Sequence, residues 1–335
     1  MFVSNDRHVA DMRSMTMSPG AVSAATSSHL HAADGRLHAG LRILTVVLAL
    51  IVGMSLAALP HLWYGRTLAT FLQAVLMLPL MGAGFFLLAP RLDRRPVGSY
   101  GMQLDRGWWS DLVAGIVIGT VMVATAAAVL LGGGWAQVEE VWSPGTTEPA
   151  VAAALAAALL LTAVTALWEE LVFRGHLIAN AAERRARRRS ARSAVAGGVL
   201  LSIPAFASLH VFSLDAPGTA PWGLALAHLL ALGALLGVAY AFSGRLALPL
   251  GIHIAHNLSV VAIVGMRGEF SERSATVVRL GIDGPSWLVG MSGIAQLIGV
   301  GIGSAVLWAW LRRSGRPSIH EDIARSPDRT PSPSV

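Results

Sequence analysis

The side chains best suited to catalysis in this sequence are acids and histidines placed at helical spacing inside apolar segments. The stretch WEELVFRG puts Glu169, Glu170 and Arg174 at the end of a long uncharged segment. Residues four apart share a helix face, so Glu170 and Arg174 are expected to pair, while Glu169 faces elsewhere. Glu169 is then available as a general base. The competing interpretation is that both acids only pair with Arg174 or solvent at a helix end.

Two further stretches repeat this spacing. PAFASLH places Phe206 and His210 four apart, and GIHIAHN places His253 and Asn257 four apart. Each pair is expected on one helix face. Histidine can transfer a proton, and the asparagine amide can stabilise a developing negative charge. Together with the acid pair, these residues predict a site inside a helical bundle.

Other polar residues in apolar segments receive structural interpretations. A single histidine in a membrane span commonly hydrogen-bonds to a neighbouring helix, and we expect this of His228. His256 points away from His253 and is expected to pack beside the site. The arginine-rich stretch AERRARRRS, residues 182–190, predicts a loop that fixes membrane orientation. Of the acidic residues, only Glu169 and Glu170 are expected to lie against a span.

Composition indicates a membrane protein. Hydrophobic residues make up 54% of the 335 residues and charged residues 13%, about half of what soluble proteins carry. The fold class predicted is all-α, a polytopic membrane helical bundle with about eight transmembrane helices. The expected spans are 43–60, 67–90, 112–134, 149–168, 193–214, 217–243, 246–266 and 286–311.

The arginine distribution predicts the topology. If both termini are cytoplasmic, twenty arginines fall in cytoplasmic segments and four in outside loops, as the positive-inside rule requires. All 25 basic residues are arginine, which favours a GC-rich bacterial source and a bacterial plasma membrane. Although the pI is near 11, the arginines lie between spans, so nucleic acid is not an expected partner. With no cysteine, thiol chemistry and disulfides are excluded.

The chain divides into five parts by these criteria. The two tails are polar and are expected to be disordered. The parts are a disordered N-terminal tail 1–40, three transmembrane helices 41–145, a catalytic core 146–266, a loop and last transmembrane helix 267–313, and a disordered C-terminal tail 314–335.

The three motifs, in their order, resemble a known family. EExxxR, FxxxH and HxxxN on successive apolar segments are similar to the motifs of the CPBP family. These are CAAX-processing and bacteriocin-processing intramembrane endopeptidases, also called the ABI family, and include the type II CAAX prenyl proteases. The resemblance covers about residues 150–265 and implies hydrolysis of peptide bonds in membrane-associated peptides or proteins.

The resemblance also implies a role for each matching residue. Glu169 and His210 would activate a water molecule, and His253 and Asn257 would stabilise the oxyanion. Glu170, Arg174 and Phe206 would give structural support.

The family is commonly labelled metalloprotease, so zinc is a possible cofactor, with Glu169, His210 and His253 as its ligands. The sequence contains no HExxH motif. A metal-free reaction through an activated water molecule is therefore the preferred interpretation.

Two other functions stay open. A transporter or channel is compatible with charged residues in spans, although paired halves are not evident. A non-catalytic membrane scaffold or immunity protein with the same fold is the other possibility. The sequence indicates a membrane substrate and a lipid bilayer as partners; it fixes neither the substrate's identity nor the oligomeric state.

Overall fold

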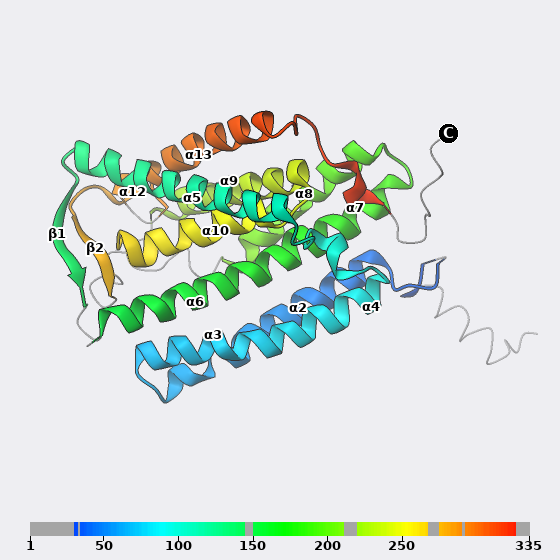
Figure 1. Ribbon diagram of the computed structural model, residues 1–335, viewed down its shortest axis with the longest axis horizontal. Helices are drawn as coiled ribbons and strands as arrows, with labels where there is room; N and C mark the ends of the chain where they lie inside the picture. Colours follow the sequence, from blue (N-terminus) through cyan, green and yellow to red (C-terminus); the bar gives the residue numbers. More distant parts are fainter. Residues whose placement is uncertain are drawn as a thin grey trace, which may run out of the picture.

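The computed structural model describes residues 30–32, 34–144, 150–210, 220–266, 275–289 and 292–325. Most helices run along one long axis and form an elongated bundle (Figure 1). The described elements are α2 (Ala39–Ala57), η1 (Leu59–Leu62), α3 (Arg66–Gly82), η2 (Ala83–Leu88), α4 (Ala89–Asp93), η3 (Val97–Tyr100), α5 (Arg106–Gly132), β1 (Ala136–Ser143), α6 (Val151–Glu170), η4 (Leu171–Ile178), α7 (Ala179–Ala186), α8 (Ala191–Leu209), α9 (Trp222–Ser243), α10 (Ala247–Leu258), η6 (Ser259–Ile263), β2 (Thr276–Ile282), α12 (Ser286–Val289), α13 (Ile294–Arg313) and η7 (Glu321–Ala324).

The helical membrane architecture predicted from composition is confirmed. Seven helical segments of the described residues are long and apolar enough to cross a membrane. The segment expected at 246–266 forms a shorter apolar helix, Ala247–Ile263, roughly 25 Å long at 1.5 Å per residue. With it, the chain traverses the bundle eight times.

Two β-strands are present that were not expected from the sequence. Strands β1 and β2 pair antiparallel at one end of the bundle, with Ala136 opposite Ile282 and Ser143 opposite Thr276 (Figure 1). A bulge between Val138 and Glu140 interrupts their register. The sheet therefore joins the segment after α5 to the segment after η6.

The short helix α10 lies at the centre of the bundle, where it packs against α5, α6 and α9. Its contact with α5 is a backbone-to-backbone crossing. A Cβ atom on Gly115 would lie 2.9 Å from the backbone nitrogen of Ile252, and one on Gly251 would lie 2.9 Å from that of Ile116. Glycine is required at both positions because no side chain fits between the helices.

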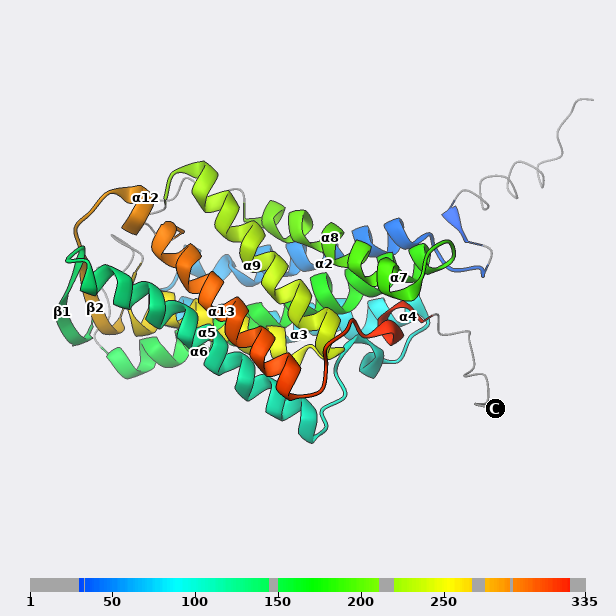
Figure 2. The ribbon, with the colours of Figure 1, turned by 90° about the horizontal axis from the view of Figure 1, so that it is seen from above.

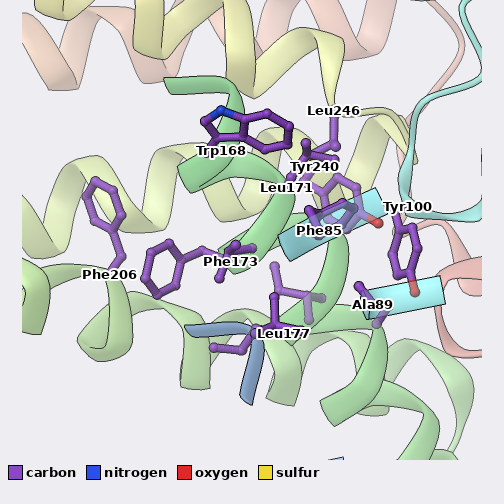
Figure 3. Close-up of a cluster of buried hydrophobic side chains, with 14 of the residues drawn as sticks. Phe85, Ala89, Tyr100, Trp168, Leu171, Phe173, Leu177, Phe206, Tyr240 and Leu246 are labelled. Carbon is purple, nitrogen blue, oxygen red and sulfur yellow. The ribbon is translucent and has the colours of Figure 1, made fainter. Parts of the chain in front are cut away.

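A large apolar cluster holds α6 and η4 among their neighbours. Figure 3 shows part of it, with Phe173 of η4 beside Phe206 of α8 and Trp168 at the end of α6. The stretch from Trp168 to Glu183 is buried at every residue. Polar groups in this stretch therefore depend on protein partners rather than on water or lipid headgroups.

Both predicted tails are more ordered near the bundle than expected. Residues 1–29 and 326–335 lie outside the described residues. In the predicted N-terminal tail, Arg36 is buried and pairs with Asp34 and Glu183. In the predicted C-terminal tail, Arg316 donates to both oxygens of Asp111, and η7 packs on α7 and α8. Specific ion pairs order these segments although their composition is polar.

The first and last described segments lie at the same end of the bundle (Figures 1 and 2). This agrees with an even number of crossings. That this end is cytoplasmic stays a prediction.

The expectation that only Glu169 and Glu170 lie against a span is wrong, because three other acids are buried at the arginine-rich end. Asp93 accepts hydrogen bonds from Tyr100, Arg42 and Asn180. Glu183 accepts from Arg36 and Arg95. Asp111 is buried in α5 and pairs with Arg316. The sequence assigned these acids to loops because each lies near the end of an apolar segment.

Candidate active site

The first motif forms the predicted pair and an additional contact across helices. Arg174 Nη1 donates to Glu170 Oε1 at 3.0 Å, and both side chains are completely buried. The same carboxylate oxygen lies 2.9 Å from His253 Nδ1 on α10. Glu170 therefore joins the first and third motifs, with the imidazole Nδ1–H as donor and the carboxylate as acceptor.

Arg174 lies in η4, a π-helical segment that begins directly after Glu170. Its guanidinium carbon lies 4.5 Å from the centre of the Phe206 ring, within the range of a cation–π contact. Short π segments often occur at functional sites because they widen the helix and redirect side chains. Glu170, Arg174 and Phe206 thus lie in contact and are buried, while their supporting role stays a prediction.

Glu169 points inward rather than towards lipid. Its side chain is about 5% exposed, and its Oε2 lies 3.7 Å from His253 Nε2. Oε2 has no hydrogen-bond partner. Glu170 is therefore held by two partners through Oε1, whereas Glu169 has an oxygen that faces a histidine without a hydrogen bond; Oε2 of Glu170 has no partner either.

The second motif lies at the end of α8, where the helix stops at Leu209 rather than continuing to 214 as expected. His210 forms the C-cap, and its Nδ1 lies 3.0 Å from the carbonyl oxygen of Phe206. A carbonyl in the last turn lacks a helical N–H partner, and the imidazole Nδ1–H satisfies it. This hydrogen bond leaves Nε2 as an acceptor in the neutral ring.

The Phe206 ring holds the two motif histidines near each other. Its centroid lies 4.7 Å from that of His210 and 5.8 Å from that of His253. Phe173 packs edge-on against the same ring, as Figure 3 shows. The aromatic residue of the second motif therefore contacts both imidazoles.

Asn257 of the third motif is partly exposed, and its Oδ1 lies 3.2 Å from His256 Nδ1. With the imidazole N–H as donor, the amide N–H₂ of Asn257 is left to donate elsewhere. The expectation that His256 packs beside the site is confirmed, and this contact gives it a definite partner.

A small cavity of about 100 Å³ connects the second and third motifs. It is lined by Phe206, His210, His228, Leu229, Leu232, His253, His256, Asn257, Val260, Val261 and Ser292. Glu169 is not among the lining residues and contacts this group through His253. The structure thus brings His210, His253 and Asn257 to one cavity, and both acids contact His253.

A larger cavity of about 650 Å³ lies between α3 and α6 and meets the small one at Asn257 and Val261, which line both. Its walls carry several hydroxyl and amide side chains, which are Thr67, Thr70, Gln73, Thr162 and Thr165. The site therefore adjoins a groove large enough for a peptide segment.

The interpretation of His228 as a helix-to-helix hydrogen-bonding residue is wrong. Neither of its ring nitrogens has a hydrogen-bond partner, although the side chain is buried. It lines the small cavity instead. No sequence pattern could predict this, because the cavity is lined by residues of α8, α9 and α10 together.

Zinc binding by Glu169, His210 and His253 stays a prediction. Across the described part of the chain, no three His, Cys, Asp or Glu side chains are grouped as ligands of one ion.

The comparison with protein families agrees with the location of this site. Residues 151–259 match a family model described as type II CAAX prenyl endopeptidase Rce1-like. The matched segment begins at α6 and ends just after Asn257, so it contains all three motifs. Searches of curated proteins and of solved structures found no match.

Proposed function

Since residues 151–259 match the family model of Rce1-like type II CAAX prenyl endopeptidases, we propose that this protein is an intramembrane endopeptidase. Its substrates are membrane-associated peptides or proteins. The observation that carries the proposal is the buried cluster in which Glu169 and Glu170 both contact His253, beside a cavity lined by His210 and Asn257.

In the proposed reaction, Glu169 accepts a proton from a water molecule while the water oxygen attacks the scissile carbonyl carbon. The unpartnered Oε2 of Glu169 supports this role, since it is free to accept that proton. His210 assists through Nε2, which its hydrogen bond to Phe206 leaves as the acceptor nitrogen. When the carbon–nitrogen bond breaks, the proton passes to the leaving amine, giving a carboxyl group and an amine.

Asn257 and His253 are proposed to stabilise the oxyanion of the tetrahedral intermediate. The amide of Asn257 is oriented by His256, so its N–H₂ group can donate to the developing charge. His253 donates through Nε2 only when its ring carries both protons, because Nδ1–H already serves Glu170. The role of Glu170 is therefore to set the orientation and protonation of His253.

The groove between α3 and α6 is the proposed substrate path. It meets the small cavity at Asn257, so a peptide lying in it reaches the oxyanion donors. Threonine and glutamine side chains along the groove can pair with peptide N–H and C=O groups, which is needed where water is scarce.

The proposed reaction uses no metal ion. Protein prepared in a chelator and washed free of metal is expected to cleave at the full rate. Loss of cleavage that added zinc restores would establish the zinc-dependent version instead.

The proposal is tested by incubating purified protein in detergent or vesicles with a library of membrane peptides, prenylated C-terminal CAAX peptides included. We expect wild type and the control Glu139→Ala, which removes an exposed acid on β1, to cleave the same peptides. Glu169→Ala and His210→Ala should be inactive. Cleavage by Glu169→Ala at the wild-type rate would refute its role as base. A wild type that cleaves no peptide but binds one would favour a scaffold.

A further inference from the structure

His228 on α9 is a buried histidine whose hydrogen-bonding capacity is unused. Its side chain is about 4% exposed, and neither Nδ1 nor Nε2 has a hydrogen-bond partner. Buried polar groups in folded proteins nearly always have a partner from protein, water or ligand. An imidazole with both nitrogens unpaired therefore points to a partner that the protein chain itself does not provide.

The location of His228 indicates where that partner binds. It lines the same cavity of about 100 Å³ as His210, His253 and Asn257. The other groups facing it are the His256 ring, 5.6 Å away between centroids, and the side chains of Phe206, Leu229 and Ser292. Apolar neighbours cannot satisfy an imidazole, and the cavity is large enough for a few water molecules or a small group of a ligand.

We propose that His228 is a substrate-binding residue: its imidazole hydrogen-bonds to the peptide unit on one side of the scissile bond. This inference rests on the proposed function. A neutral imidazole offers one donor and one acceptor, and a peptide unit offers one acceptor and one donor.

The arrangement of the two cavities indicates how a bound peptide would reach His228. Asn257 stands where the groove and the small cavity meet. A peptide whose scissile carbonyl lies at Asn257 extends along the groove on one side and into the small cavity on the other. His228 is the polar residue on α9 that meets the second part, opposite the histidines of α8 and α10.

A binding role and a structural role predict opposite effects on stability. If His228 serves the substrate, its unpaired nitrogens destabilise the empty protein, and His228→Leu should keep or raise the melting temperature. If it serves helix packing, the same change should lower the melting temperature. This readout does not depend on cleavage.

The kinetic test uses a peptide that wild type cleaves. His228→Leu is expected to lower kcat/KM about 10- to 100-fold, mainly through a higher KM, because a hydrogen bond to substrate is lost. His228→Gln, which keeps a donor and an acceptor, should recover part of this loss. Leu226→Met, a volume-conserving change on α9 at a residue that is not among those lining the cavity, should leave kcat/KM unchanged.

The outcomes separate the inference from the proposed function. If wild type cleaves and His228→Leu matches it, the inference is wrong while the proposed function holds. A His228→Leu protein that loses stability and activity together also overturns the inference, since the residue is then structural. If wild type cleaves no peptide, the proposed function fails, and the inference fails with it.

Discussion

The two neighbouring glutamates of the first motif differ in what holds them. Glu170 Oε1 accepts from Arg174 and from His253, whereas Glu169 Oε2 has no hydrogen-bond partner. Oε2 of Glu170 has no partner either, so the acids differ in that only Glu170 is held by two groups through its other oxygen. A buried acid held in this way serves stability and geometry, and one that is not is available for chemistry. This difference can be measured because glutamine can replace either glutamate and has nearly the same size and shape.

Glu170→Gln is expected to lower the free energy of unfolding by about 3–5 kcal/mol, since it leaves the buried Arg174 without its carboxylate. Glu169→Gln should cost less than about 1 kcal/mol, because no hydrogen bond to its Oε2 is lost. Both should abolish cleavage. Thermal unfolding of the two variants in the same detergent provides the comparison, and equal losses of stability would contradict the assignment of roles.

The proposed role of Asn257 as an oxyanion donor can be tested by removing its side-chain amide. Asn257→Ala removes the proposed oxyanion donor and should lower kcat about 100- to 1000-fold, the usual effect of losing one such donor. Its stability should change little, because the side chain is partly exposed. Single-turnover cleavage is the measurement. A change confined to KM would mean that Asn257 binds substrate without stabilising the transition state.

At this scale the sequence predicted contacts within one helix and not those between helices. The pairing of Glu170 with Arg174 follows from their spacing. The contact of Glu170 with His253 does not, because it depends on how α6 packs on α10. Likewise, the spacing of Phe206 and His210 predicted a shared face, but only the structure shows that the helix ends there and that the ring contacts both imidazoles.

At the scale of elements, the crossing of α5 and α10 determines where the third motif lies. Gly115 and Gly251 face each other's backbone at this crossing. His253 is only two residues beyond Gly251 on α10. Any change that separates the two helices therefore moves His253 relative to Glu170.

Gly251→Ala is expected to destabilise the protein by about 1–3 kcal/mol through overpacking and to lower kcat. Gly132→Ala at the end of α5 is the matched control, since a Cβ there meets open space. The control should keep wild-type activity and be slightly more stable, because alanine is the better helix former. Melting temperature and initial cleavage rate test both variants, and a Gly251→Ala protein as stable as the control would refute tight packing.

Part of this crossing was visible in the sequence. Gly115 and Gly119 form a GxxxG pattern, which marks close helix contacts in membranes. The pattern does not identify the partner helix, and α10 is the least obvious span because it is the shortest. The pairing of β1 with β2 could not be predicted either, because two short strands more than a hundred residues apart carry too little periodicity.

At the scale of the whole molecule, charged residues tie the chain ends to the arginine-rich end of the bundle. Asp34 pairs with Arg36, which also pairs with Glu183 at the end of the fourth span. The hydrogen bond from the Arg36 side chain holds the pKa of the Asp34 carboxyl at about 2, below the ordinary 3.8. The ionised carboxylate is therefore favoured by folding.

The pH dependence of stability follows from this shift. A carboxyl with a lowered pKa stabilises the fold above its unfolded pKa, and the contribution is lost as the pH falls from about 4 to about 2. Solvent screening limits the contribution to about 1 kcal/mol or less. Asp34→Asn should thus lower the melting temperature at pH 7, and this effect should shrink as the pH falls from about 4 towards about 2. A difference that does not shrink over this range would show that packing, not charge, is responsible.

The segment after the last span is held more firmly, and its removal should affect the whole bundle. Arg316 Nη1 donates to both carboxylate oxygens of Asp111, at 2.8 and 2.7 Å, and Asp111 is fully buried in α5. Arg316→Ala leaves this carboxylate with Trp310 and a more distant Arg245. Because α5 also packs on α10, the loss of this ion pair is expected to disturb the helix that carries His253.

We therefore expect Arg316→Ala to lower the free energy of unfolding by about 2–4 kcal/mol and to reduce cleavage in proportion to the folded fraction. Arg313→Ala, which removes an exposed arginine at the end of α13, is the control and should have no measurable effect. Asp111→Asn combined with Arg316→Ala should recover part of the stability, because no charge is then left unpaired. If the double variant is no more stable than Arg316→Ala, the segment stabilises the bundle through the packing of η7 rather than through this ion pair.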